Sequence, residues 1–379
     1  MQKTNPSKPS INWLPLSVFS LSAIITLLGI PYYAITQGFD GWQFFAMIVG
    51  VVFCEMSITA GYHRLWSHRA YQAHWLIRLF FAIGGTYAVQ NTILHWASDH
   101  RIHHTHVDNN HKDPYSAKRG FWYSHMGWMI RNYNLNPNTN FENCKDLKKD
   151  PIVMFQHKHY ITLVLTINFG IPTLLGIWHG DIIGMMLLAG VARLFISHHF
   201  TFFINSLAHI WGRQPYSDKN SSKDNPIIAL LTFGEGYHNY HHSFQRDYRN
   251  AVHWWQYDPT KWLIRSLSLM GLTQKLYRTP LEHIETAHAK MLLKKTLLHL
   301  SGKHHAETLI LRLHDEYDIF IENINAFTQA RKQWLEAKKN TVLNNYDLDK
   351  LKEKADALKF KLLQQKKNWL NLNNQLVTP

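Results

Sequence analysis

Apolar and polar positions follow one another in long blocks along this chain, and four of the apolar blocks are long enough to cross a membrane. A helix needs about 20 apolar residues to span the hydrocarbon core of a bilayer. The first block is flanked by Trp13 on one side and by Tyr32 and Tyr33 on the other, as is typical of aromatic side chains at a membrane interface. We therefore expect four transmembrane helices, at residues 11–35, 41–60, 160–178 and 182–203.

Three histidine clusters lie beside these blocks: His63 with His68, HRIHH at 100–104 and HNYHH at 238–242. The last two place histidines at positions i, i+3 and i+4, which share one face of a helix. Five residues turn an ideal helix by about 140°, so the first pair needs a helix end or a distortion to converge. Eight clustered histidines are too many for one tetrahedral zinc site. The pattern predicts a site for two metal ions, and imidazole ligands leave iron, copper, nickel and zinc open.

Two neighbouring features are given structural roles. His106 and His111 lie close to the second cluster but lack histidine partners at i+3 or i+4, so we leave them out of the site. The GEG sequence at 234–236 lacks the spacing of phosphate-binding glycine loops. We expect it to form a backbone bend that delivers the third cluster.

A fifth apolar stretch, residues 76–96, separates the first two clusters. If it crossed the membrane, these clusters would lie on opposite faces and could not share a site. Charged, glycine and amide positions interrupt it, Gln90 and Asn91 among them. We therefore expect an interfacial or re-entrant segment rather than a fifth span.

The distribution of basic residues predicts the orientation. The short turns at 34–40 and 179–181 contain no lysine or arginine, whereas basic residues are frequent at the N-terminus, in 64–158 and after 209. Short loops rich in lysine and arginine stay on the cytoplasmic side. We therefore expect both turns outside, and the three clusters and both chain ends in the cytoplasm.

Composition and charge narrow the classes of function. The 379 residues carry a net charge of +14, which suits anionic lipid or an acidic ligand as well as nucleic acid. Beside four apolar blocks, we expect the partner to be the lipid bilayer and not nucleic acid. The two cysteines, Cys54 and Cys144, form no CxxC pair, which excludes a disulfide framework and a thiolate metal site.

The composition changes at residue 280 to a charged, helix-forming tail. Apolar residues recur there with heptad-like spacing in two runs, 313–334 and 348–376, with a turn expected at 340–347. The pattern predicts two helices that pair as a hairpin or with partners. We expect a membrane domain at 1–279 and a helical extension at 280–379 that is a structural appendage or joins copies into an oligomer.

These sequences resemble a known family, the integral-membrane fatty acyl desaturases, and specifically its acyl-CoA Δ9 (stearoyl-CoA-like) branch. The similarity runs from about residue 42 to residue 272, and the tail lies outside it. Five motifs carry it: ITAGYHRLWSHRAY at 58–71, QN…W…DHRIHH at 90–104, DPYSAKRGFWYSHMGW at 113–128, NSLAH at 205–209 and GEGYHNYHHSF at 234–244.

The resemblance implies an all-α integral-membrane fold in which four transmembrane helices carry a cytoplasmic helical cap around a di-iron site. The implied iron ligands are nine histidines, with an asparagine that reaches one iron through water: His63, His68, His100, His103, His104, His209, His238, His241, His242 and Asn205. The implied substrate positions line an acyl tunnel, close its end or face an anionic head group: Gln90, Trp96 and Thr201; Val51 and Glu55; Lys118, Arg119 and Arg131. One departure is Ser98, which stands where animal relatives carry a basic residue.

The reaction implied by the resemblance is the oxygen-dependent introduction of a cis double bond into a saturated acyl chain, with acyl-CoA as the expected substrate. Two iron ions are the expected cofactor and O2 the co-substrate. No fused haem or flavin module is evident in the sequence, so we expect a separate electron donor of ferredoxin or cytochrome type on the cytoplasmic side.

Two other functions remain open from the residues alone. Membrane hydroxylases of alkyl, sterol or carotenoid type also use three histidine clusters, and their product is an alcohol rather than an alkene. A histidine-lined metal transporter would need ligands within its spans. Here the clusters lie at the ends of the spans, which disfavours transport.

Overall fold

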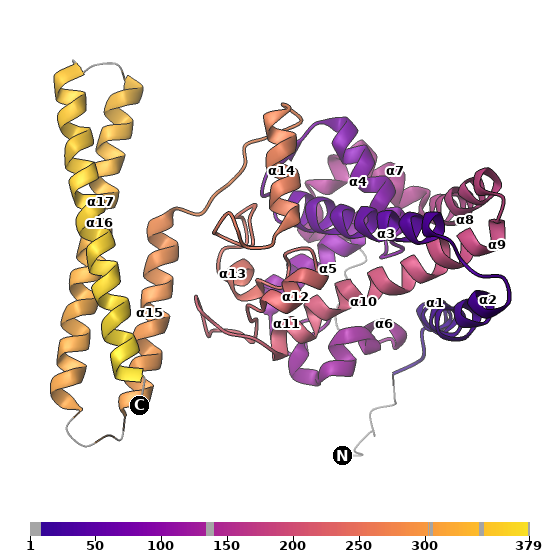
Figure 1. Ribbon diagram of the computed structural model, residues 1–379, viewed down its shortest axis with the longest axis horizontal. Helices are drawn as coiled ribbons and strands as arrows, with labels where there is room; N and C mark the ends of the chain where they lie inside the picture. The colour runs from indigo at the N-terminus through magenta and orange to yellow at the C-terminus, as the bar shows by residue number, and fades with distance from the viewer. Residues whose placement is uncertain (1–8, 134–139, 302, 304–305, 341–344, 378–379) are drawn as a thin grey trace. The chain divides into compact units, whose positions relative to one another are not determined.

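The computed structural model describes residues 9–133, 140–301, 303, 306–340 and 345–377 (Figure 1). The chain forms two compact units. The first comprises Met1–Arg213 and Lys219–Arg278, and the second comprises Gln214–Asp218 and Thr279–Pro379.

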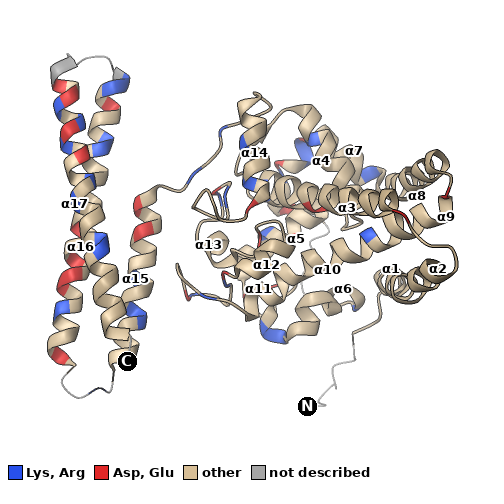
Figure 2. Ribbon diagram, viewed as in Figure 1, with Lys and Arg blue, Asp and Glu red and all other residues tan. Residues whose placement is uncertain are grey.

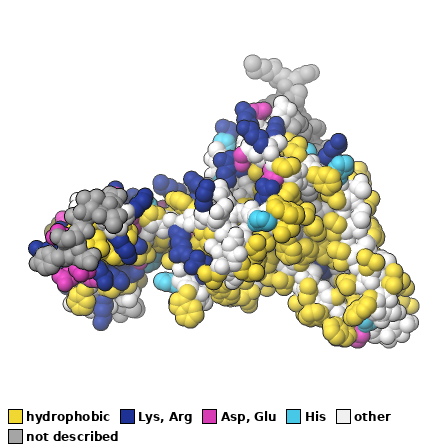
Figure 3. All heavy atoms as spheres, turned by 90° about the horizontal axis from the view of Figure 1, so that it is seen from above, with side chains coloured by type: hydrophobic (Ala, Val, Ile, Leu, Met, Phe, Trp, Pro, Cys, Tyr) yellow, Lys and Arg dark blue, Asp and Glu magenta, His cyan; other side chains and the backbone are white. Residues whose placement is uncertain are grey.

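Four helical segments of the first unit are long and apolar enough to cross a membrane, as predicted: Trp13–Thr36, Gly41–Ser67, Tyr160–His179 and Ile182–Ile210. Charged side chains are sparse along them (Figure 2), and many of their apolar side chains are exposed, as expected of lipid-facing residues (Figure 3). The second and fourth spans extend beyond the predicted ends at residues 60 and 203. The elements that compose the spans are α1 (Trp13–Ile24), η1 (Ile25–Gly29) and α2 (Ile30–Thr36); α3 (Gly41–Met56) and η2 (Ser57–Ser67); α8 (Tyr160–His179); and α9 (Ile182–Met185), η7 (Met186–Ala192), α10 (Arg193–Asn205) and α11 (Leu207–Ile210).

The two short turns between the spans are joined by side chains. Asp40 caps α3 by accepting hydrogen bonds from the backbone N–H groups of Trp42 and Gln43. Its carboxylate is also 2.7 Å from Nε2 of His179, at the end of α8. Gln43 in turn donates to Asp181 at 2.7 Å. The two turns therefore lie on the same side of the bundle.

The fifth apolar stretch is not a span. Its helix α4 (Trp75–Tyr87) has 13 residues, too few to cross, and a break at residues 88–92 precedes α5 (Ile93–His106). Buried side chains satisfy the backbone at this break. Arg193 donates to the Tyr87 carbonyl at 2.6 Å, and Nε2 of His198 lies 2.9 Å from the Ala88 carbonyl. Irregular backbone among membrane helices is stable only where such partners replace water.

A cap of short helices packs on the ends of the spans and holds the histidine clusters (Figure 1). A small antiparallel sheet, with Gln72 opposite Gln274, ties the segment after the second span to the end of the unit. The remaining elements of the first unit are β1 (Gln72–Ala73), η3 (Ala117–Arg119), η4 (Tyr123–Gly127), α6 (Trp128–Ile130), η5 (Glu142–Cys144), η6 (Leu147–Lys149), α7 (Pro151–Lys158), α12 (Pro226–Leu231), α13 (His238–Ser243), α14 (Pro259–Leu269) and β2 (Thr273–Gln274).

The second unit corrects the prediction of two tail helices, because three are present: α15 (Leu281–Leu300), α16 (Glu307–Asn340) and α17 (Asn345–Val377). The heptad positions do pair α16 with α17, and α15 packs against the same core, whose buried members include Leu313, Phe320 and Trp369. Helix α15 was missed because its apolar positions do not follow one stripe. Of the predicted turn, residues 345–347 are helical and 341–344 lie outside the described part of the chain.

Candidate metal centre

Nine histidines converge into two groups at the membrane side of the cap. The possible ligand atoms within each group all lie within 4.8 Å of one another. We call the first set group one and the second set group two: His63, His68, His100, His104 and His241; and His103, His209, His238 and His242.

The first histidine pair is aligned by a π-helix. Helix η2 continues the second span with hydrogen bonds from residue i to i+5, and His68 N–H donates to the His63 carbonyl at 3.1 Å. Residues five apart therefore stack one turn above another, and the two imidazole centroids are 4.8 Å apart. This is the distortion that the spacing of His63 and His68 required.

The second cluster occupies α5, where residues i, i+3 and i+4 face the same side. Arg101, on the same helix, fixes α5 to the end of η2. Its guanidinium donates to the carbonyls of Trp66 and Ser67 at 2.7 and 3.1 Å. It also forms a bidentate ion pair with Asp146, with N–O distances of 2.8 and 2.9 Å. The Arg101 side chain thus joins the helices of the first two clusters independently of any metal.

The third cluster is delivered by a tight bend. Gly234 has φ of 102°, and a Cβ at Gly236 would lie 2.1 Å from the backbone nitrogen of Ala229. Side chains other than hydrogen are excluded at both positions for these reasons. Helix α13 follows, and Asp224 accepts hydrogen bonds from two N–H groups in its first turn, those of Asn239 and Tyr240, at 2.7 and 3.0 Å.

His209 lies on α11, at the end of the fourth span, and completes group two. Spacing alone did not reveal it, because it stands apart from the three clusters. Its Nδ1 lies 2.8 Å from the hydroxyl of Ser221, which lies 2.5 Å from the carboxylate of Asp108. Asn205 ends α10, one turn before His209.

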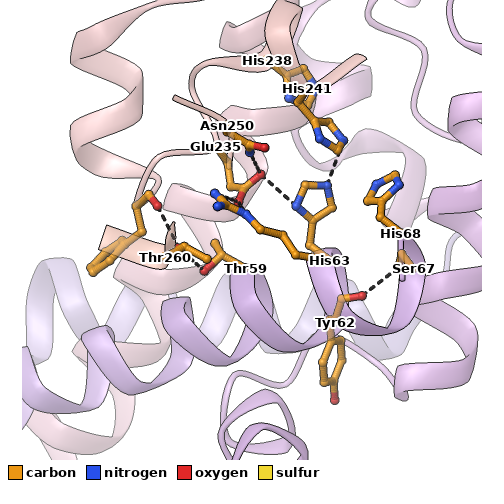
Figure 4. Close-up of polar contacts among 12 residues, drawn as sticks. Thr59, Tyr62, His63, Ser67, His68, Glu235, His238, His241, Asn250 and Thr260 are labelled. Atoms are coloured by element: carbon orange, nitrogen blue, oxygen red, sulfur yellow. Dashed lines mark hydrogen bonds and ion pairs between the residues drawn. The ribbon is translucent and has the colours of Figure 1, made fainter. Parts of the chain in front are cut away.

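Two histidines, His63 and His103, each have a buried carboxylate next to the ring nitrogen Nδ1. Glu235 lies 2.8 Å from Nδ1 of His63 and accepts hydrogen bonds from Arg64 and Asn250, with His63 turned toward His241 (Figure 4). Burial alone would raise the pKa of Glu235, but its electrostatic interactions and hydrogen bonds with His63 and Arg64 outweigh burial and lower that pKa to about 2.

In group two, Asp113 lies 2.9 Å from Nδ1 of His103. Such carboxylates fix the tautomer and orientation of a metal-binding imidazole. Sequence reasoning missed Asp113 and also Glu235. Two signals were available in the sequence: Glu235 stands three residues before His238, and Asp113 begins the DPY motif.

Six of the clustered imidazoles outside the spans are held in the neutral form. Burial, and then the proximity of other imidazoles or basic residues, lowers the pKa of each well below the usual 6.5: His68, His100, His104, His238, His241 and His242. A neutral imidazole has a free lone pair, which is the form that binds metal.

The spacing of the ring nitrogens tests whether metal ions fit. Nε2 of His68 is 2.8 Å from that of His100, and in group two Nε2 of His209 is 3.1 Å from that of His238. The other close pairs are 3.0 to 3.4 Å apart. Ligands bound at about 2.1 Å are about 3.0 Å apart across a right angle and about 3.4 Å apart at the tetrahedral angle. These close pairs therefore fit nitrogen ligands that share a metal ion within each group.

The expected tunnel residues form two sets, one linked through Thr201 and one stacked on group one. Gln90 donates to Thr201 at 2.8 Å, and the Thr201 hydroxyl lies 3.5 Å from Glu55, which is fully buried on α3. Val51 is buried one turn earlier on the same helix. The indole of Trp96 stacks on the His100 ring at 4.9 Å. Trp96 therefore places an apolar surface beside the histidines, and Thr201 links the α4–α5 break to α3.

The expected head-group residues do not form one cluster. Lys118 is largely exposed and lies 3.9 Å from Asp108. Arg119 packs on the ring of Tyr123 at 3.7 Å. Arg131 donates instead to the Pro9 carbonyl near the start of the described chain. Ser98 is buried and donates to Asn143 at 2.9 Å, so its side chain faces the protein interior.

Comparisons with known proteins match this arrangement. The model of the fatty acid desaturase family matches residues 40–277. Acyl-CoA desaturase 1 of Saccharomyces cerevisiae is 50% identical over 236 residues, which cover 61% of this chain and 45% of that protein. A probable acyl-CoA desaturase of Schizosaccharomyces pombe is 42% identical over 73% of this chain and 56% of that protein. Stearoyl-CoA desaturase 5 of Bos taurus is 35% identical, covering 73% of this chain and 81% of that protein.

The chain thus spans about half the length of the two yeast relatives that it matches. The matched region contains both histidine groups and the residues that hold them. Family model, relatives and geometry agree, and this chain belongs to the fatty acid desaturase family.

Proposed function

We propose that this protein is an oxygen-dependent desaturase that introduces a cis double bond at the Δ9 position of a saturated acyl chain carried by CoA. The observation that supports this most is the pair of histidine groups, with Trp96 stacked on His100, in a chain of this family. The names of the relatives refer to acyl-CoA, stearoyl-CoA and Delta(9) desaturases, but one relative is an acyl-CoA Delta12-desaturase. The position of the double bond therefore needs its own measurement.

The chemistry requires a metal cofactor because an unactivated methylene has no acidic proton for a side chain to remove. We propose that groups one and two each hold one iron ion, and that Asn205 reaches one of them through water. When bound, the two ions would supply oxidation of the substrate C–H bonds by O2 and two electrons. The overall change converts a saturated chain, O2, two electrons and two protons into an alkene and two waters.

The side chains orient the metal-binding imidazoles and define where the substrate approaches them. Neutral imidazoles offer their Nε2 lone pairs, and Glu235 and Asp113 hold the rings of His63 and His103 in one orientation. The stack of Trp96 on His100 gives an apolar surface beside group one, where a methylene can approach. The Gln90–Thr201 hydrogen bond joins the α4–α5 break to the fourth span and fixes the path beside it.

Product analysis tests the proposal. The full chain is expressed in a desaturase-deficient host together with a ferredoxin or cytochrome donor, and the fatty acids are identified by mass spectrometry. We expect monounsaturated chains with a cis double bond between carbons 9 and 10. The His103→Ala variant is the inactive control. An alcohol as the main product would indicate a hydroxylase, and a Δ12 product would refute the proposed position.

We also propose that the histidine clusters face the cytoplasm, with the two short turns outside. The lack of basic residues in both turns supports this orientation, as does their side-chain pairing through Asp40 and His179. Reporter fusions at residues 37–40 and 179–181 should report an external position, and fusions at Asn140 and Asn250 a cytoplasmic one. A fusion at Asn140 that reports outside would contradict the shared metal centre, since Asn140 follows α5.

The reaction needs an external source of electrons, because the side chains around the histidine groups supply none. We propose a separate ferredoxin or cytochrome that docks on the cytoplasmic cap. The C-terminal unit is proposed as a site of self-association or of donor docking, which the exposed apolar side chains Leu311, Phe360 and Leu363 support.

A further inference from the structure

One loop follows the helix that bears His209 of group two and ends at the residue that caps the helix bearing His238 and His242. It runs from Arg213 to Asp224, and these two residues close it as a backbone pair, with N–O distances of 3.0 and 2.7 Å. Before the loop is α11, which carries His209. Asp224, at its other end, caps the first turn of α13. We call residues 213–224 the bridging loop.

Within the bridging loop, Ser221 determines how His209 presents its nitrogens. The backbone N–H of Ser221 donates to Asp108 at 2.7 Å, and its hydroxyl lies 2.5 Å from the same carboxylate. An ionised carboxylate only accepts hydrogen bonds, so the Ser221 hydroxyl donates to Asp108. That hydroxyl must then accept from Nδ1–H of His209 at 2.8 Å. The lone pair of His209 is thereby placed on Nε2, which faces His238 at 3.1 Å.

The outer part of the bridging loop belongs to the C-terminal unit. Residues Gln214–Asp218 are part of that unit, although the chain before and after them belongs to the first. Asp218 forms an ion pair with Lys294 of α15, and the ring of Tyr216 lies 6.0 Å from that of His288 on the same helix. Asp218 precedes Ser221 by three positions. A segment of the C-terminal unit therefore ends three positions before the residue that orients His209.

We propose that Ser221 is a positioning residue for His209, and that the C-terminal unit keeps Ser221 in place by holding Gln214–Asp218. The tail then governs the retention of metal in group two and leaves group one unaffected. The inference rests on the proposed function only in requiring that both groups bind metal. It gives the tail, which lies outside the matched family region, a specific effect on the centre.

The first test measures iron per chain in full-length purified protein. Ser221→Ala should lower the affinity of group two by about 10–100-fold, the usual effect of removing a partner of a metal-binding imidazole. At limiting iron it should retain one ion where the unmodified protein retains two. Ser221→Thr, which keeps the hydroxyl, should restore the second ion. Ser222→Ala is the matched control, because Ser222 is the neighbouring loop serine, more buried than Ser221, and its hydroxyl bonds to Asn220.

The affected group is identified in a second background. In His241→Ala, which weakens group one, the remaining ion reports on group two, and adding Ser221→Ala should remove it. Equal loss of both ions in Ser221→Ala alone, or loss in Ser222→Ala, would show a folding defect and overturn the positioning role. Two ions retained with unchanged affinity would overturn it as well. Protein without metal in the unmodified chain would instead refute the proposed function.

The role of the tail is tested by Lys294→Glu, which places two carboxylates together at Asp218. Hydrogen–deuterium exchange of metal-free protein should show about fivefold faster exchange in the bridging loop, the upper range for an exposed ion pair, and iron binding by group two should weaken. Lys295→Glu is the control, since Lys295 is exposed on the same helix and has no ion pair among the described residues. Unchanged exchange and iron binding in Lys294→Glu would refute control by the tail.

Discussion

Replacing His241 or His103 with alanine is expected to abolish desaturation, and each replacement should release metal from a different group. His241 belongs to group one and His103 to group two. His241 Nε2 lies 3.0 Å from Nε2 of both His63 and His104. Replacing His241 therefore removes a nitrogen that lies next to both of these ligand atoms. Both ions are needed for the proposed oxidation, so emptying either group should reduce product below detection.

Iron content and product are measured on the same preparations. The unmodified protein should hold about two irons per chain, in line with its two ligand groups, and each variant about one. His106→Ala is the control, because His106 lies on α5 two positions after His104 but outside both groups. Full activity in either variant at unchanged iron content would contradict the di-iron assignment.

The membrane architecture could be predicted from the sequence because it depends on local properties. Apolar length determines the spans, and the Gln90–Asn91 interruption indicates that α4 does not cross. The i, i+3, i+4 spacing of the histidines in α5 and α13 likewise predicts that they share one helix face. The His63–His68 pair indicated a distortion, although the π-helix that provides it could not be specified from spacing.

The residues that hold the centre could not be predicted, because their contacts join distant parts of the chain. Glu235 meets His63 across 172 positions, and Ser221 meets Asp108 across 113. A single acid or serine in a loop carries no periodic signal. Helix α15 was missed for the related reason that its packing depends on α16 and α17 together. Heptad spacing reveals a pair of helices but not a third helix laid against them.

Selection of the carbon to be oxidised poses a separate physical problem. Burying one methylene contributes roughly 0.8 kcal/mol, so apolar attraction alone separates chains of neighbouring length only a few-fold. A pocket that fits the chain end can separate them by about 10–200-fold. A sharp preference therefore needs a fixed head and a closed end. Val51 and Glu55 are buried on successive turns of α3, and the Glu55 carboxyl group lies 3.5 Å from the Thr201 hydroxyl. One carboxylate oxygen of Glu55 has no partner in the described part of the chain.

We expect substitutions at these two positions to change the preferred chain length without moving the double bond. Val51→Ala or Glu55→Ala removes bulk at the proposed tunnel end and should favour longer chains, whereas Val51→Trp fills the space and should favour shorter ones. Each shift should reach about tenfold in the ratio of products that differ by two carbons, measured by mass spectrometry with mixed saturated substrates. Val52→Trp is the matched control, because Val52 is 39% exposed on the outward side of the same helix. The distance of the double bond from the carboxyl end should stay constant, since the head and the metal ions determine it. An unchanged profile in all three variants would exclude α3 as the end of the tunnel.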